Sequence, residues 1–289
     1  MPYLYLALSI VASAMLSIMS SAFKRVNSEV PDTASFYNVI VTVSAVACWG
    51  VRWAFDFFFS PKILLYALLY GIFYTMAMTG LFKAIEFGSV SLTSFVKQLS
   101  LIAVSVWGFI FWGAPVTPLI IVGMALIVLS LYLCFAHQKG DTGGGVSLKW
   151  LLAAALLLAG NAGASIVQKY QQMEFSGKGG SALMFFATAF SALACIVIYL
   201  KGRLPEVSRI SKPTLLCPIV GGVSSTLLNA FIILMLSSTL STSIIFPGIA
   251  VGGMILTILF SVAVYKERLS AIRWLGLAVG ALALVLLNI

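Results

Sequence analysis

Apolar residues of this chain gather in long runs separated by short polar breaks. Ten runs are present, at residues 3–23, 34–55, 62–82, 89–112, 117–136, 148–168, 181–200, 213–236, 240–265 and 271–289. Each run has the length of roughly 20 residues with which a helix crosses a hydrocarbon layer of about 30 Å. A transmembrane barrel would instead show alternating hydrophobicity over segments of about ten residues. The pattern therefore predicts an all-α membrane protein with ten transmembrane helices.

The breaks between the runs are short and rich in turn formers, which leaves no room in them for a further domain. The Gly-rich break at 140–145 follows the fifth run. We therefore expect one integral membrane domain made of two halves, 1–140 and 141–289, with five helices in each.

The two halves resemble each other most clearly near their ends. Thr117 precedes Gly123 by six residues, and Ser270 precedes Gly276 by the same interval. A repeat with an odd number of spans inserts upside down relative to its twin, and inverted repeats are the architecture of many alternating-access transporters. We therefore expect the halves to be two inverted five-helix repeats.

Composition excludes an ordinary soluble domain. The mean hydropathy is +1.10, and only 9% of the residues are charged, against about a quarter in soluble proteins. The net charge of +9 comes from Lys and Arg beside the ends of the runs, where they orient the chain and contact lipid, so nucleic acid is not an expected partner. The four cysteines stand singly in apolar runs. Without metal-ligand spacing they predict packing residues, and we expect no metal and no cofactor.

The basic residues are divided unequally between alternate breaks. The breaks after runs 1, 3, 5, 7 and 9 hold twelve Lys and Arg, and the other breaks hold four. Because basic residues favour the cytoplasmic side, this count predicts that both termini lie outside the cytoplasm.

The last two runs carry a recognisable motif. Pro247 and Gly248 open the ninth run, Glu267 follows it, and Gly276 lies in the tenth. With ten spans and a five-plus-five repeat, the chain resembles the drug/metabolite transporter (DMT) superfamily, EamA type. The resemblance implies a secondary transporter in the bacterial inner membrane with both termini in the cytoplasm, opposite to the charge count.

The first half departs from that motif. Ser94 stands where the second half has Pro247, and Ala114 stands where it has Glu267. The opening residues also resemble the four-span multidrug relatives of the superfamily, whose first helix carries an essential glutamate at a position that here falls near Ser13. The absence of this acid argues against their proton-for-cation exchange.

Lys97 is the clearest ionised side chain inside a run. One interpretation is that its stem reaches back to the lipid headgroups; the other is that it faces a wet cavity and attracts an anionic group of a solute, because charges inside spans are costly and usually functional. Ser94 and Gln98 are expected to line the same site beside it.

Tyr66, Tyr70 and Tyr74 follow one another at four-residue spacing in the third run. Such a stripe packs helices together or lines a cavity, where phenol rings stack on an aromatic or cationic solute. We place Tyr70 and Tyr74 in the candidate site.

Amides inside spans must find hydrogen-bond partners in a medium without water. Asn38, Asn161 and Asn229 each share a helix face with a hydroxyl residue. They either join neighbouring helices or line the cavity, and we include all three in the candidate site.

Pro247 and Gly248 are expected to form a hinge or gate, because proline removes a backbone hydrogen bond from the helix.

These features favour a secondary transporter that exports a small organic metabolite, such as an amino acid or a related carboxylate, by alternating access. A drug or quaternary-amine exporter of the same superfamily and a lipid flippase are the alternatives. An enzyme is not expected, because no Asp, Glu or His occurs deep in a run. The expected partners are a small solute and membrane lipid, with the chain acting as a monomer or a homodimer.

Overall fold

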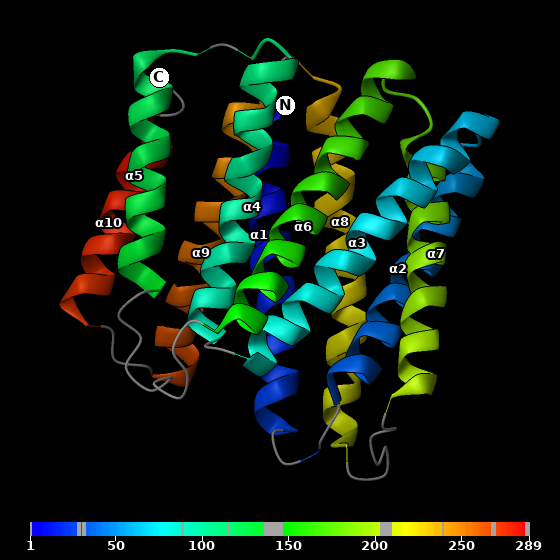
Figure 1. Ribbon diagram of the computed structural model, residues 1–289, viewed down its shortest axis with the longest axis horizontal. Helices are drawn as coiled ribbons and strands as arrows, with labels where there is room; N and C mark the ends of the chain where they lie inside the picture. The colour runs from blue at the N-terminus through cyan, green and yellow to red at the C-terminus, as the bar shows by residue number, and fades with distance from the viewer. Residues whose placement is uncertain are drawn as a thin grey trace. The chain divides into compact units, whose positions relative to one another are not determined.

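The computed structural model describes residues 2–27, 30, 33–87, 90–114, 116–135, 147–202, 210–238, 240–266 and 270–286 (Figure 1). Within these residues all regular structure is helical. The helices are α1 (Pro2–Val26), α2 (Thr33–Phe55), α3 (Pro61–Phe87), α4 (Val90–Phe111), α5 (Pro118–Phe135), α6 (Leu148–Glu174), α7 (Gly180–Lys201), η2 (Lys212–Leu215), α8 (Leu216–Leu236), α9 (Thr242–Tyr265) and α10 (Ala271–Leu286).

Each apolar run of the sequence corresponds to one α-helix. Seven helices are long and apolar enough to cross a membrane, and α4, α5 and α10 contain the shorter apolar segments 96–111, 118–134 and 271–283. The prediction of an all-helical membrane protein is therefore confirmed.

The largest boundary difference lies in α6, which continues beyond the predicted run to Glu174. Its last turns carry Gln168, Gln171 and Gln172, which are buried within the protein. Gln171 donates to the carbonyl of Lys178 (2.8 Å). Because protein and not lipid surrounds these amides, polarity does not end the helix there.

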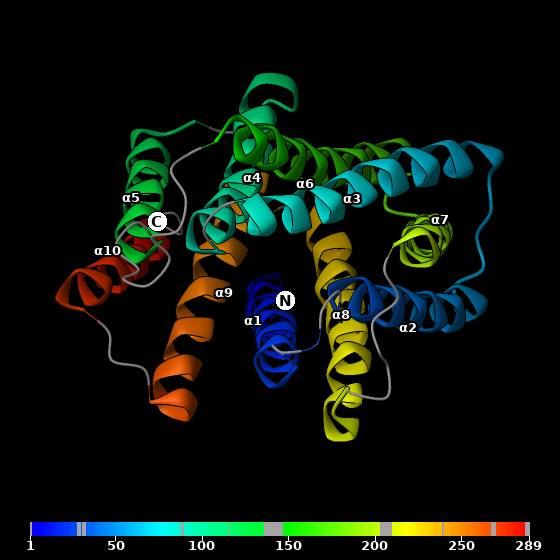
Figure 2. The same cartoon turned by 60° about the horizontal axis from the view of Figure 1, so that its bottom comes forward.

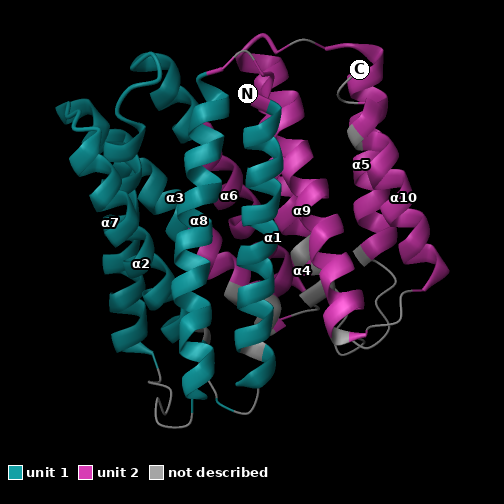
Figure 3. Ribbon diagram, turned by 180° about the vertical axis from the view of Figure 1, so that it is seen from behind, with its two compact units in different colours: residues 1, 3–75, 167–237 teal, residues 2, 76–166, 238–289 magenta. Residues whose placement is uncertain are grey.

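The described helices form two compact units, shown in separate colours in Figure 3. Unit 1 comprises residues 3–75 and 167–237, and unit 2 comprises 76–166 and 238–289. The division passes through α3 and α6. Each unit therefore contains helices from both halves of the sequence.

In unit 1, α2 packs against α7 and α8. An aromatic cluster joins α2 to α7, because the Trp53 ring stacks on Phe185 (5.1 Å between centroids). Near the other end of α2, Phe23, Tyr37, Val41 and Ile210 form a buried apolar cluster.

In unit 2, α4 packs against α9, and α5 packs against α10. Ile127, Leu131, Val251 and Leu277 belong to the apolar core that these helices share. Three of the packed pairs, α2 with α7, α4 with α9 and α5 with α10, join helices that are five apart in the chain.

Glycine permits the closest approach between α3 and α6. A Cβ added at Gly80 would lie 2.4 Å from the backbone nitrogen of Leu157 and 2.8 Å from the carbonyl oxygen of Ala153. Backbone atoms cannot rotate away as a side chain can. Even one methyl group at Gly80 must therefore push the helices apart.

We predict that Gly80→Ala destabilises the protein by about 1–3 kcal/mol, the usual cost of overpacking a tight interface. Unfolding in detergent, followed by tryptophan fluorescence, measures the change. Gly71→Ala in the same helix is the control, because its added Cβ meets its nearest atoms at 3.1 Å and 3.3 Å. Equal stability of Gly80→Ala and wild type would contradict the close contact.

Candidate functional site

Lys97 lies in the second turn of α4, within unit 2. Its side chain is partly exposed. Among the residues that the structure describes, no carboxylate pairs with its ammonium group. Within the described part of the chain, Lys97 is therefore a cation in an apolar helix without a counter-ion.

The turn of α4 that carries Lys97 is tied to α6. The Asn161 side-chain amide donates to the Ser100 hydroxyl (2.7 Å), and that hydroxyl donates to the backbone carbonyl of Lys97 (2.6 Å). Asn161 therefore joins helices, one of the two roles that the sequence left open. Gln98 is partly exposed beside Lys97, whereas the Ser94 side chain lies outside the described residues.

Tyr70 and Tyr74 lie together in unit 1. Their rings stack with centroids 6.1 Å apart and an interplanar angle of 16°. The Tyr70 hydroxyl donates to the side-chain oxygen of Asn229 in α8 (3.3 Å). Asn229 in turn donates to the carbonyl of Ser225 (2.9 Å), whose hydroxyl interacts with Tyr74. Two rings from α3 and two polar residues from α8 thus form one cluster.

Asn38 is buried in α2 of unit 1. Its backbone carbonyl accepts a hydrogen bond from the Thr42 hydroxyl (2.8 Å). The predicted site residues therefore fall into two groups. Tyr70, Tyr74, Asn38 and Asn229 belong to unit 1, and Lys97, Gln98, Asn161, Pro247 and Gly248 belong to unit 2.

Pro247 lies inside α9, six residues after the Ser241 N-cap, and Pro247 and Gly248 are both buried. The proline nitrogen has no hydrogen to donate to the carbonyl four residues earlier, that of Ser243. The Ser243 side chain lies 2.7 Å from that of Ser241. The start of α9 therefore has a weaker backbone ladder than the rest of the helix.

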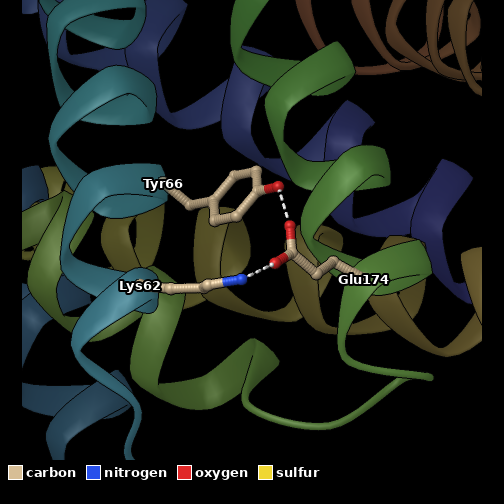
Figure 4. Close-up of polar contacts among 3 residues, drawn as sticks. All are labelled: Lys62, Tyr66 and Glu174. Carbon is tan, nitrogen blue, oxygen red and sulfur yellow. Dashed lines mark hydrogen bonds and ion pairs between the residues drawn. The ribbon is translucent and has the colours of Figure 1, made fainter.

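A polar contact between α3 and α6 was not predicted from the sequence. We call it the Glu174 triad, and it consists of Lys62, Tyr66 and Glu174 (Figure 4). The Lys62 ammonium forms an ion pair with the Glu174 carboxylate (3.0 Å), and the Tyr66 hydroxyl donates to the other carboxylate oxygen. No spacing in the sequence relates Glu174 to Lys62, because the two residues are 112 positions apart.

The described residues contain no group of His, Cys, Asp and Glu that could hold a metal ion. The predicted site residues that the structure describes offer hydrogen-bonding side chains, a stacked pair of phenol rings and the ammonium group of Lys97.

An all-helical fold with seven membrane-length helices defines an integral membrane protein. Residues 2–136, which contain the first five helices, match the EamA-like transporter family. This part of the chain is thus similar to a family of membrane transporters that belongs to the DMT superfamily.

Two further proteins are similar to this chain. A protein of Haemophilus influenzae (strain ATCC 51907 / DSM 11121 / KW20 / Rd), described as uncharacterized, is 26% identical over 201 residues, which are 68% of this chain and 65% of that protein. A protein of known crystal structure matches with a TM-score of 0.74 at 13% identity, over 99% of this chain and 95% of that one. The second likeness shows the fold alone.

We predict an energetic coupling between Asn161 and Ser100. A double-mutant cycle with Asn161→Ala and Ser100→Ala should give a coupling free energy of about 0.6–1.7 kcal/mol, as hydrogen bonds between membrane helices do. Unfolding in mixed micelles measures it. The control cycle combines Asn161→Ala with Ser130→Ala, since Ser130 bonds the carbonyl of Gly276 instead. Additive effects in both cycles would contradict the Asn161–Ser100 bond.

Proposed function

We propose that this protein is a secondary transporter that exports a small organic solute with an anionic group, such as an amino acid or a related carboxylate. The observation that carries the proposal is Lys97, an ammonium group in a membrane helix with no carboxylate partner among the described residues. A charge in this medium is costly. A solute carboxylate would offset the cost while it is bound.

The surroundings of Lys97 support a recognition role. Asn161 and Ser100 hold the backbone of its turn in place while the long side chain stays partly exposed. In this proposal Gln98 adds a neutral hydrogen-bond donor and acceptor beside the ammonium group, and Ser94, whose side chain lies outside the described residues, stays a predicted site residue. A fixed backbone reduces the entropy that is lost when a solute is bound.

We infer that alternating access uses two inverted repeats, 1–140 and 141–289. Three packed pairs join helices five apart in the chain, which is the pairing expected of corresponding helices in five-helix repeats. Pro247 and Gly248 would provide the hinge, because the backbone ladder of α9 is interrupted there.

Lys97→Ala should reduce transport by at least about tenfold, because the lost ion pair is worth more inside the membrane than in water. The measurement is uptake of labelled amino acids and carboxylates by proteoliposomes. Lys201→Ala removes an exposed charge from the end of α7 and is the control. Wild-type protein that moves no solute under any gradient would refute the proposal. Unchanged transport by Lys97→Ala would remove the role of the ammonium group.

A drug or quaternary-amine exporter is the second candidate, and the stacked pair Tyr70 and Tyr74 favours it. Aromatic faces attract cations through their π electrons. If this candidate is right, quaternary amines will inhibit uptake, Tyr74→Leu will relieve the inhibition, and Lys97→Ala will not weaken amine transport. Competition assays in the same proteoliposomes separate the two classes of solute.

A further inference from the structure

The Glu174 triad lies where two long helices meet. Glu174 is the last residue of α6, and Lys62 and Tyr66 lie in the first two turns of α3. At 27 residues α6 is about 40 Å long, which exceeds the hydrocarbon thickness of about 30 Å. α6 is therefore long enough to reach the headgroup region, and the ion pair lies on the surface of the protein: the side chains of Lys62 and Glu174 are 74% and 36% exposed.

Unit 1 has a second contact of the same kind with different chemistry. Asn27, just after α1, donates to the Thr214 hydroxyl in η2 (3.0 Å) and accepts from the Ser211 backbone nitrogen (3.0 Å). Asn27 is only 3% exposed. The contact thus joins the end of α1 to the start of α8 through buried, neutral groups.

The two contacts occupy corresponding places in the proposed repeats. α6 follows α1 by five helices, and α8 follows α3 by five helices. In Figure 1 the end of α1 and the start of α8 lie at the bottom, whereas the start of α3 and the end of α6 lie at the top. Helices of unit 1 are therefore joined near both ends. A buried amide joins α1 to η2 at one end, and an exposed ion pair joins α3 to α6 at the other.

The two contacts differ in the free energy that is needed to separate their partners. Opening the Asn27 contact would leave buried amide and hydroxyl groups without partners, which is costly. Opening the Glu174 triad exposes its charges to water, which solvates them, and an exposed ion pair is held only weakly. The neighbouring aromatic contact, Phe175 with Tyr66 (6.3 Å), depends little on direction and tolerates sliding.

We propose that the Glu174 triad is a releasable latch that opens in each transport cycle, while the Asn27 contact stays closed. The inference rests on the proposed transport function. Release frees the start of α3 from α6. Because α3 continues as one helix from Tyr66 to Tyr70 and Tyr74, a movement of its start displaces the aromatic pair and its bond to Asn229.

Neutralising the latch tests the proposal. Glu174→Gln should speed solute exchange in proteoliposomes about twofold to fivefold, the range that one exposed ion pair supplies. Exchange is measured with saturating solute on both sides, so that the rate reports the conformational step. Asp56→Asn is the control, since Asp56 is the described carboxylate that bonds Ser181 at the start of α7 and takes no part in the latch.

Ionic strength gives a second readout. Raising the salt from about 0.01 M to about 1 M shortens the Debye length from about 30 Å to about 3 Å. Wild-type exchange should become faster with salt, whereas Glu174→Gln should respond little. Both proteins keep Lys97, so any effect of salt on the solute site is shared and cancels in the comparison.

A covalent link between α3 and α6 tests the opposite change, because it keeps the contact closed. The double variant Lys62→Cys and Glu174→Cys, joined by a short bis-maleimide linker, should stop exchange. Linker-treated wild type, with its four free cysteines, is the control. Full exchange by the linked protein, or an unchanged rate and salt response in Glu174→Gln, would overturn the latch. If wild type itself exchanges no solute, the proposed function fails instead.

If Glu174→Gln does not fold, Lys62→Met combined with Tyr66→Phe removes the same two bonds and should give the same acceleration.

Discussion

Polar groups inside a membrane protein need partners, because the hydrocarbon offers none, and this constraint shapes the structure at every level. Backbone groups meet it by forming helices. Many hydroxyl groups meet it within their own helix, as Thr188 does by donating to the Met184 carbonyl (2.6 Å), and some meet it in a neighbouring helix, as Ser130 does at the carbonyl of Gly276. Amides reach farther, and Asn161 joins α6 to α4. Lys97 has no carboxylate partner among the described residues, and for this reason we propose a solute-binding role for it.

The same constraint explains why the helices were predictable from the sequence. A run of about 20 apolar residues in lipid has one stable conformation, so run length alone located all ten helices. It could not locate the end of α6. Gln171 and Gln172 are polar enough to end a span in lipid, yet they are fully buried against protein, and hydropathy does not distinguish these two surroundings.

The candidate site was predictable only in part. Four-residue spacing indicated that Tyr70 and Tyr74 share a face, and their rings do stack. Spacing carries no information about contacts between helices, so the bonds of Tyr70 to Asn229 and of Asn161 to Ser100 emerged only from the structure. Glu174 lies outside the predicted apolar runs, where a charge is ordinary, so its sequence position did not mark it. Its partner Lys62 is 112 residues away in the chain.

Glu174 and Lys97 lie in different surroundings, and this difference agrees with the different roles that we propose for them. A carboxylate deep in a span would have to lose its water, which costs more than an exposed ion pair returns. At the end of α6, Glu174 keeps its hydration whether it is paired or free, so little energy is needed to switch it. Lys97 lies within the apolar part of α4, where a charge interacts strongly with a bound solute. In the mechanism that we propose, solute recognition would use the site where electrostatic interactions are strong, and movement would use the site where they are weak.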